Sequence, residues 1–246
     1  MNNGMTRRSM MGGAVAAGAL VALSSEKAAA QASSDASKPG AFVYTEVQIS
    51  VPFGEAPWEE ISESIKQQPG FINKTWLSGL GTNSLGGFYS FEDIESAQRF
   101  VTGYFPTEAK SFGVAHNTRV FDASVAEEAS LELNSPHFGA PARTSPGAFV
   151  YTELQINVPF ESAPWRERNP NLLQTPGLIS KVWLSGINTN TLGGFDAFET
   201  LSDAQAFAID DFPKVASELN CAFYTRIFDA TVTEHASRTM KSPYYT

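Results

Sequence analysis

The chain of 246 residues contains little cysteine, histidine or charge: one Cys, three His and 17% charged residues. Because Cys221 is its only thiol, the chain forms no internal disulfide, and we expect this residue to be a small buried hydrophobe. The histidines, His116, His137 and His235, include no closely spaced pair, so we expect no metal site. The sequence also lacks a Gly-rich nucleotide motif and a nucleophile elbow, which argues against nucleotide-dependent enzymes and α/β-hydrolases.

The charge that is present is mostly negative. Asp and Glu number 26 against 17 Lys and Arg, and the formal net charge is −9. Residues 1–32 carry a net charge of +2, so the rest of the chain carries −11. An acidic protein of this kind repels nucleic acids and anionic lipid surfaces. We therefore expect no nucleic-acid partner and no stable membrane insertion after the N-terminal segment is removed.

Long hydrophobic runs are also missing. The apolar stretch at residues 12–23 has 12 residues, whereas a membrane helix needs roughly 20. Arg7 and Arg8 precede this stretch, and small residues follow it at 28–32. This order predicts a signal peptide over residues 1–32 of the twin-arginine (Tat) type, with a Sec signal as the alternative. We expect a periplasmic or secreted protein with a disordered N-terminal segment at residues 33–40.

The rest of the sequence contains one unit twice. Residues 41–130 align with residues 148–237 at a constant offset of 107 without a gap, and 48 of the 90 aligned positions are identical. We call these segments the first and second repeat. Residues 131–147 are rich in Pro, Ser and Gly and are predicted to be a linker. Residues 238–246 are predicted to be a C-terminal tail.

Each repeat has the pattern of a β-α-β-β-α-β unit. In the first repeat, hydrophobic periodicity and turn residues predict strands at 41–51, 71–78, 86–92 and 114–123, with helices at about 57–68 and 94–112. Asp93 is the expected cap of the second helix, and Pro106 is expected to kink or break it. This order is typical of a ferredoxin-like α+β fold, with a four-stranded antiparallel sheet and both helices on one face.

The other face of such a sheet carries too many aromatic side chains to remain in water. We place on it Phe42, Tyr44, Glu46, Gln48, Lys74, Trp76, Asn117, Arg119 and Phe121. The second repeat provides an equivalent face, so we predict that the two sheets pack together as a pseudo-dimeric α+β barrel within one chain. Because the sheets are then covered internally, we expect a monomer or a weak dimer.

Two strings in the sequence resemble a known family. They are PGFINKTWLSGLGTNSLGGFYSFEDIESAQRF and its counterpart PGLISKVWLSGINTNTLGGFDAFETLSDAQAF. Their Pro-Gly-x-x-x-Lys-x-Trp and Gly-Gly segments, with a final strand that ends in Phe-Asp, are similar to the YdhR-type monooxygenases of the dimeric α+β barrel superfamily. The sequence departs from this pattern at Asp196, where the first repeat has Tyr89, and at Asn169-Pro170 within the first helix of the second repeat.

The resemblance implies a ferredoxin-like unit that pairs through its sheet. Members of the wider superfamily oxidise aromatic polycyclic compounds with dioxygen and without metal or flavin, and others bind or degrade haem. The resemblance therefore implies a cofactor-independent monooxygenase whose substrate is a small aromatic or polycyclic molecule.

Candidate site residues are the polar and aromatic side chains that both repeats share. Trp and Tyr would stack on a flat substrate, Glu would be the general base, and Lys or Arg would steady a phenolate or enolate. The predicted catalytic residues are Trp76, Trp183, Glu46, Glu153, Arg119 and Arg226. The predicted substrate-binding residues are Tyr44, Tyr151, Gln48, Gln155, Lys74 and Lys181. We expect Glu46 to meet Arg119 across the neighbouring first and fourth strands.

Other interpretations of these residues stay open. The same charges would also form a satisfied polar network inside the barrel. The protein would then be a non-catalytic barrel of the cell envelope that binds small apolar ligands. Haem binding through His116 is a third possibility. A cavity of a few hundred Å³ with Trp76 or Trp183 and an ionisable side chain on its wall would favour the enzyme. A barrel filled by its own side chains would favour the ligand-binding protein.

Overall fold

The computed structural model describes residues 38–245 apart from residues 50, 83 and 190. The predicted signal peptide, and residues 33–37 of the predicted disordered segment, lie outside the described residues. The first repeat consists of β1 (Ala41–Gln48), α2 (Trp58–Lys66), β2 (Phe71–Ser78), β3 (Ser84–Phe91), α3 (Ile94–Arg99), η2 (Phe100–Tyr104), α4 (Phe105–Ser111) and β4 (His116–Asp122). The second consists of β5 (Ala148–Leu154), α6 (Trp165–Leu172), β6 (Leu178–Ser185), β7 (Leu192–Phe198), α7 (Leu201–Ala206), η6 (Phe207–Asp211), α8 (Phe212–Glu218) and β8 (Phe223–Asp229).

Local sequence signals explain where these elements begin and end. The Asp93 side chain accepts a hydrogen bond of 2.7 Å from the backbone N–H of Ser96, which confirms the predicted helix cap. The helix after this cap runs from α3 into α4 through the π-helical turn η2, directly before Pro106. The wider turn accommodates a proline that has no N–H to donate, so the chain stays helical past Pro106 and the helix does not break there.

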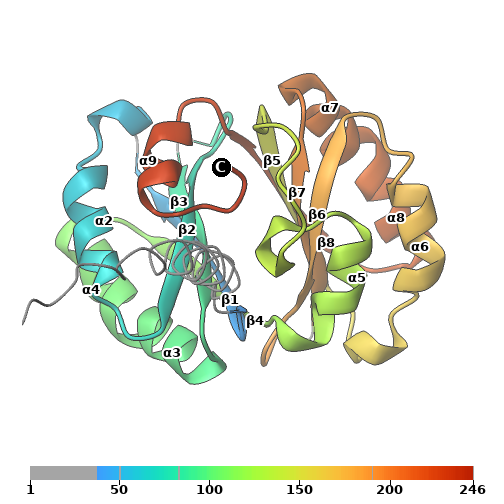
Figure 1. Cartoon of the computed structure of the whole chain (residues 1–246), viewed down its shortest axis with the longest axis horizontal. Helices are drawn as coiled ribbons and strands as arrows, with labels where there is room; N and C mark the ends of the chain where they lie inside the picture. Colours follow the sequence, from blue (N-terminus) through green and yellow to red (C-terminus); the bar gives the residue numbers. More distant parts are fainter. Residues whose placement is uncertain (1–37, 50, 83, 190, 246) are drawn as a thin grey trace, which may run out of the picture. The chain divides into compact units, whose positions relative to one another are not determined.

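The strands form two antiparallel sheets, in the orders β2-β3-β1-β4 and β6-β7-β5-β8. Helices α2, α3 and α4 cover the outer face of the first sheet, and α6, α7 and α8 cover the outer face of the second (Figure 1). Short bridges join the sheets at both edges, Gly79 to Phe228 and Phe121 to Gly186. The eight strands therefore close into one barrel, which confirms the predicted α+β class and the pairing of two ferredoxin-like units within one chain.

Aromatic side chains fill the space between the sheets. The Tyr44 and Tyr151 rings stack with their centroids 4.1 Å apart, and the Phe88 and Phe195 rings stack at 4.3 Å. Phe42, Phe121, Phe149 and Phe228 belong to the same buried cluster. The alternation predicted for β1 is confirmed, because Val43 packs against the helices while Phe42 and Tyr44 face the other sheet.

The edge strands β2 and β6 are covered by short helices that are exchanged between the repeats. Helix α5 (Glu127–Glu132) lies at the end of the first repeat but packs on β6, where the Ser130 hydroxyl accepts from the Trp183 backbone N–H at 3.0 Å. Helix α9 (Glu234–Thr239) lies at the end of the second repeat but packs on β2, where Ser237 accepts from the Trp76 N–H at 2.9 Å. Each sheet edge is thereby capped by the other half of the chain.

The connection between the repeats and the C-terminal segment both pack into this barrel. A 3₁₀ turn at Pro136–Phe138 buries His137 beside the Phe42 and Phe88 rings. Tyr244 lies against His137 and Phe149, with ring centroids 5.3 and 4.9 Å apart. The segments predicted to be a linker and a C-terminal tail thus complete the core, because their aromatic side chains are buried in apolar surroundings.

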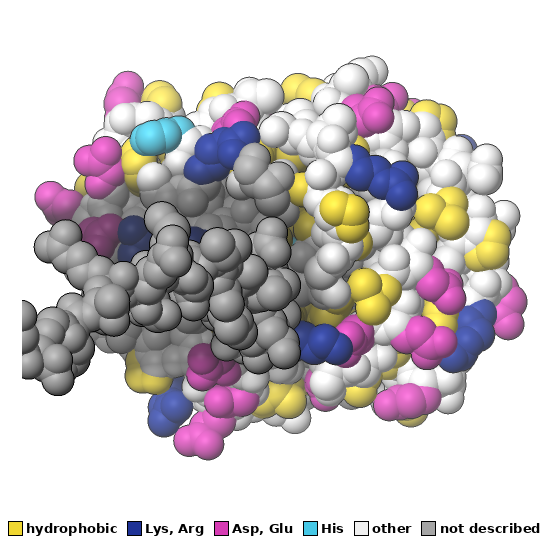
Figure 2. All heavy atoms as spheres, viewed as in Figure 1, with side chains coloured by type: hydrophobic (Ala, Val, Ile, Leu, Met, Phe, Trp, Pro, Cys, Tyr) yellow, Lys and Arg dark blue, Asp and Glu magenta, His cyan; other side chains and the backbone are white. Residues whose placement is uncertain are grey.

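Among the described residues, no helix has the length and apolar character that crossing a membrane requires. On the face shown in Figure 2, acidic and basic side chains are interspersed with single apolar side chains. Scattered apolar residues of this kind are ordinary on a protein surface.

We predict that Phe88→Ala destabilises the protein by about 3–5 kcal/mol, because it opens a cavity between two stacked rings at the centre of the barrel. The matched control is Leu131→Ala at a 40% exposed side chain, which should change the free energy of unfolding by about 0.5 kcal/mol or less. Denaturant unfolding of both variants measures the difference, and equal effects would contradict the packing described here.

We predict that His137 lowers stability as the solution becomes acidic. Burial lowers the pKa of His137 from 6.5 to about 3. Between these values the unfolded chain binds a proton that the folded protein does not, so stability falls with falling pH by about 1.4 kcal/mol per unit. The difference in unfolding free energy between wild type and His137→Gln should change with this slope between about pH 6 and pH 4. Parallel curves would refute the prediction, and His116→Gln, at an exposed site, is the control.

Candidate functional site

The twelve predicted site residues lie on two opposite faces of the sheets rather than in one pocket. Tyr44, Glu46, Gln48 and Arg119, with their counterparts Tyr151, Glu153, Gln155 and Arg226, form a network between the sheets. Lys74, Trp76, Lys181 and Trp183 face the helices and line two cavities there. The twelve residues therefore do not meet in one pocket.

A bulge in β2 explains the wrong face assignment for Lys74 and Trp76. Strict alternation along 71–78 places both side chains opposite Phe71, toward the other sheet. The register shifts between Phe71 and Asn73, which adds one residue to the strand. Trp76 consequently lies in the same helix-facing cluster as Phe71. The second repeat has the same shift between Leu178 and Ser180, with the same consequence for Lys181 and Trp183.

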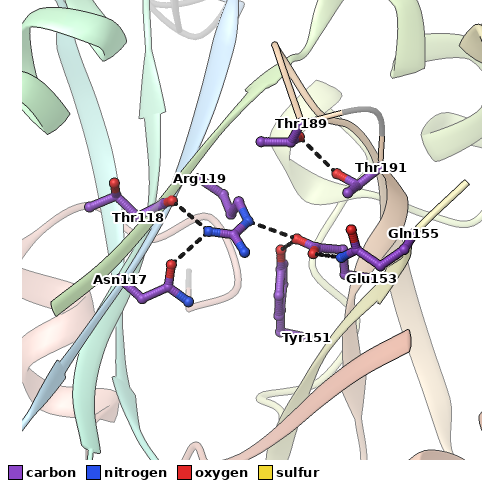
Figure 3. Close-up of polar contacts among 8 residues, drawn as sticks. All are labelled: Asn117, Thr118, Arg119, Tyr151, Glu153, Gln155, Thr189 and Thr191. Atoms are coloured by element: carbon purple, nitrogen blue, oxygen red, sulfur yellow. Dashed lines mark hydrogen bonds and ion pairs between the residues drawn. The ribbon is translucent and has the colours of Figure 1, made fainter. Parts of the chain in front are cut away.

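Between the sheets, each buried glutamate is held by residues of both repeats. In Figure 3, Arg119 of the first sheet reaches across to Glu153 of the second, with Nε 3.1 Å from Oε2. The Tyr151 hydroxyl donates to the same carboxylate at 2.6 Å, and the Gln155 amide donates to its other oxygen.

The same network occurs around Glu46. Arg226 Nε donates to Glu46 Oε2 at 3.2 Å, and the Tyr44 hydroxyl donates at 2.8 Å. The expected contact between Glu46 and Arg119 is therefore wrong. Each of the two arginines pairs with the glutamate of the other repeat. In the β1–β4 register Arg119 is opposite Tyr44, and its side chain extends toward the partner sheet instead of along its own.

The surroundings of this network keep its two buried tyrosines neutral and give hydrogen-bond donors to its two carboxylates. Burial, followed by the charge of Glu46, raises the pKa of Tyr44 well above its ordinary value. Burial and Glu153 do the same for the pKa of Tyr151. Because both carboxylate oxygens of each glutamate accept hydrogen bonds, this arrangement corresponds to the satisfied polar network.

A cavity of about 310 Å³ lies between the second sheet and its helices. Its walls are mostly apolar and come from β5 and the segment after it, β6, β7, α6, η6 and α8. They include Leu154, Ile156, Val158, Leu172, Trp183, Phe207 and Phe212. Lys181 is the buried ionisable residue on this wall. The cavity thus has the size, the tryptophan and the ionisable group that favour an enzyme.

Lys181 forms a buried ion pair with Asp196 beside this cavity. Nζ lies 2.7 Å from Asp196 Oδ1, and Asp196 is fully buried. Asp196 Oδ2 has no hydrogen-bond partner among the described residues. Burial raises the pKa of Asp196, and the Lys181 ammonium opposes this rise. The pair therefore contains a carboxylate that accepts a further proton more readily than one in water.

Trp183 is held in place by a side chain of α6. Its indole N–H donates to Asn169 Oδ1 at 2.9 Å, while the Asn169 amide nitrogen donates to the Ala129 carbonyl at 3.0 Å and to Glu132 at 2.9 Å. These bonds fix which side of Asn169 faces the tryptophan. The indole is consequently oriented in the cavity wall, with Lys181 Nζ 4.9 Å from its centroid.

The equivalent cavity of the first repeat is much smaller, about 50 Å³. Large side chains of the first repeat are replaced by smaller ones in the second. Tyr89 and Tyr104 correspond to Asp196 and Asp211, and Phe112 corresponds to Leu219. Loss of these rings leaves space that the surrounding close-packed side chains do not fill. The two repeats therefore have the same fold but unequal pockets.

The Gly-Gly segment of each repeat makes room for the buried lysine. A Cβ atom at Gly194 would lie 1.8 Å from Lys181 Nζ, and one at Gly87 would lie 2.4 Å from Lys74 Cε. A Cβ at the preceding glycine, Gly193, would meet the Thr152 carbonyl oxygen on β5 at 2.1 Å. The absence of a side chain at Gly87 and Gly194 therefore leaves the space that the lysine side chains occupy.

Sequence reasoning missed the roles of Asp196 and Asn169. Both positions stood out only as departures from the first repeat, where Tyr89 and Ser62 occur instead. Their roles depend on the bulge that turns Lys181 and Trp183 toward them. His116 is exposed on β4 and lines neither of these two cavities. No group of three or more metal-ligating side chains occurs within the part of the chain that the structure describes.

Comparisons with known proteins give a family match and similar folds. Residues 45–131 match the family described as "Putative mono-oxygenase ydhR". The search of curated proteins finds no match. Similar solved structures include an anthrone oxidase-like protein, with 14% identity, 77% of this chain and 90% of that chain covered, and a TM-score of 0.47.

Two further structures are similar at this level. A monooxygenase-like protein from Listeria innocua has 12% identity, with 78% of this chain and 95% of that chain covered and a TM-score of 0.43. A mutant chlorite dismutase from Candidatus Nitrospira defluvii has 10% identity, with 81% and 97% covered and a TM-score of 0.43.

We predict that 2-naphthol, a flat apolar probe, binds in the second-repeat cavity and that Val158→Trp weakens its binding at least tenfold by filling this space. The matched control is Val51→Trp at the equivalent position of the first repeat, where Val51 is 37% exposed. Calorimetric titration measures both affinities. Equal binding to the two variants would show that the probe binds elsewhere.

Proposed function

Because residues 45–131 match the monooxygenase family that the sequence motifs predict, we propose that this chain is a cofactor-independent monooxygenase acting on a small aromatic or polycyclic substrate. The observation that supports this proposal most directly is the cavity of about 310 Å³ with Trp183 and Lys181 on its wall. Its volume lies at the lower end of the range for small-molecule sites, and its mostly apolar lining suits a flat aromatic compound.

Of the twelve predicted site residues, Trp183 and Lys181 have the central roles in this proposal. The indole, oriented by Asn169, is the surface on which a substrate ring packs. Lys181 presents a cation to a phenolate or enolate in an environment of low polarity, where such an interaction is strong. Glu46, Glu153, Arg119 and Arg226 support the site indirectly by closing the barrel.

The Lys181–Asp196 pair provides the proton acceptor. Lys181 Nζ lines the cavity, and it passes a proton to the Asp196 carboxylate while it takes one from the substrate hydroxyl or methylene group. The products are a substrate anion, a Lys181 ammonium ion and a protonated Asp196. Desolvation of Asp196 makes this proton position accessible, and the new ammonium ion is paired with the substrate anion.

The remaining chemistry belongs to the substrate and dioxygen. The anion donates one electron to dioxygen, and the two resulting radicals combine to form a carbon–oxygen bond and a peroxide anion, which is protonated. Loss of water from this hydroperoxide leaves a carbonyl group. A methylene substrate and one dioxygen thus yield one carbonyl product and one water.

Export is part of the proposal because Arg7 and Arg8 precede the apolar N-terminal stretch. The alternative function, binding of a small apolar ligand without turnover, is supported by the same cavity. Turnover is what separates the two functions, since both require binding.

We predict that the protein consumes dioxygen with anthrone, and that Lys181→Met lowers the rate by about a hundredfold or more, because the cavity then has no amine to take the substrate proton. Trp183→Phe should weaken substrate binding by about two- to tenfold, the range expected for losing part of an aromatic contact. An oxygen electrode measures the rate, and product is identified as the quinone.

Trp76→Phe is the matched control, since Trp76 lines the small cavity of the first repeat. It should leave the rate unchanged. Binding of anthrone without any uptake of dioxygen would reject the monooxygenase and leave the ligand-binding protein. An equal loss of activity in Trp76→Phe would contradict the assignment of the site to the second repeat.

A further inference from the structure

Lys74 is a fully enclosed lysine without an acid partner. Its relative exposure is 1%, and among the described residues its Nζ makes no hydrogen bond or ion pair. Instead, Nζ lies 2.8 Å from the centroid of the Trp76 ring and 4.8 Å from that of Tyr89. A charged ammonium group is costly to bury in such a place, because aromatic rings replace only part of its lost hydration.

The second repeat shows what the same backbone does when a carboxylate is present. Lys181 occupies the position of Lys74 and is paired with Asp196 at 2.7 Å, whereas the first repeat has Tyr89 at the position of Asp196. The Tyr89 hydroxyl lies 3.3 Å from Thr45 Oγ1 and provides no negative charge. The chain therefore contains an internal comparison between a paired and an unpaired buried lysine.

Few titratable groups surround Lys74. They are Tyr89 on β3, Tyr104 at the end of η2 and Glu108 on α4. Burial lowers the pKa of Lys74 well below its ordinary value, and Glu108 opposes this only in part. Burial also raises the pKa of Glu108, which accepts a hydrogen bond of 2.5 Å from the Tyr104 hydroxyl. Both trends reduce the charge in this pocket.

Lys74 and Glu108 line the same cavity of about 50 Å³. One water needs roughly 10–15 Å³ of cavity volume, so the cavity has room for about three to five non-hydrogen atoms with their hydrogens. Phe112 also lines the cavity and is 42% exposed, so the cavity reaches the surface. A small organic molecule, but no polycyclic one, fits beside the amine.

We propose that Lys74 is an uncharged, nucleophilic amine that forms a Schiff base with a small aldehyde or ketone in the first-repeat cavity, with Glu108 as the proton donor. Buried lysines in apolar pockets are activated in this way. This site is separate from the proposed monooxygenase site and uses none of its residues.

The reaction balances without an oxidant or a reductant. The Nζ electron pair forms a bond to the carbonyl carbon, and the carbonyl π electrons move to the oxygen, which takes a proton from Glu108. Nitrogen then loses a proton to Glu108, and a further proton transfer allows the hydroxyl group to leave as water. One amine and one carbonyl compound yield one imine and one water.

The test uses the full chain with propanal and sodium cyanoborohydride, which traps an imine as a stable propyl-lysine. Peptide mass mapping compares Lys74 with Lys214, a surface lysine whose side chain is 70% exposed. An ordinary lysine becomes about tenfold more reactive per pH unit below its pKa of about 10.4, whereas an uncharged amine does not. The ratio of label on Lys74 to label on Lys214 should therefore fall about tenfold per unit between pH 7 and pH 9.

Two variants exchange the environments of the lysines. Tyr89→Asp gives Lys74 a carboxylate and should reduce its labelling at about pH 7 to that of Lys181. Asp196→Asn removes the partner of Lys181 and should make Lys181 reactive at neutral pH, which keeps the proposal testable if Tyr89→Asp does not fold. Glu108→Gln should slow labelling of Lys74 but leave its pH profile flat.

The proposal is wrong if Lys74 and Lys214 gain label with the same pH profile, because Lys74 is then an ammonium ion held by the two rings. Absence of label on Lys74 with both formaldehyde and propanal would also overturn it. Benzaldehyde, which exceeds the cavity, should label Lys74 at least tenfold more slowly than propanal, and equal rates would contradict the location.

Discussion

Two carboxylates, Glu46 and Glu153, are buried between the sheets, and much of the architecture follows from the bonds that they require. A buried charge is tolerated only when it is paired and hydrogen-bonded. Each glutamate receives a tyrosine and a glutamine from its own repeat, but its arginine comes from the other repeat. A single repeat would therefore lack the arginine for its glutamate and would expose its aromatic face to water. Pairing the two units satisfies both requirements at once.

The same dependence extends from the interface to the sheet edges and from there to the pockets. The Lys181 backbone N–H donates to the Leu133 carbonyl after α5, and the Lys74 N–H donates to the Met240 carbonyl after α9, both at 3.1 Å. Each buried lysine is thus positioned on a strand whose outer edge is closed by the other half of the chain. Closing the edge in this way also removes unpaired backbone groups that would otherwise invite strand addition.

Much of the fold was accessible from the sequence, because the offset of 107 residues and the periodicity of β1 are strong, local signals. The helix cap at Asp93 follows from similarly local chemistry. The faces of Lys74 and Trp76 were not accessible, since one bulged residue after Phe71 reverses the alternation. The partner of Arg119 depends on how two sheets meet, and such a long-range contact leaves no trace in the pattern of one strand.

The sequence difference with the largest chemical consequence is a single aligned pair, Tyr89 and Asp196. The Gly-Gly segment and the bulge are common to both repeats, so each unit is built to enclose a lysine. An aspartate beside that lysine gives a charged pair with one unbonded carboxylate oxygen, next to a cavity of about 310 Å³. A tyrosine fills much of the equivalent space and gives no counter-charge, leaving an unpaired amine and about 50 Å³. Because the strand order and the bulge are shared, the difference between the two lysine environments comes from the side chain at this aligned position, and duplication allows one chain to keep both.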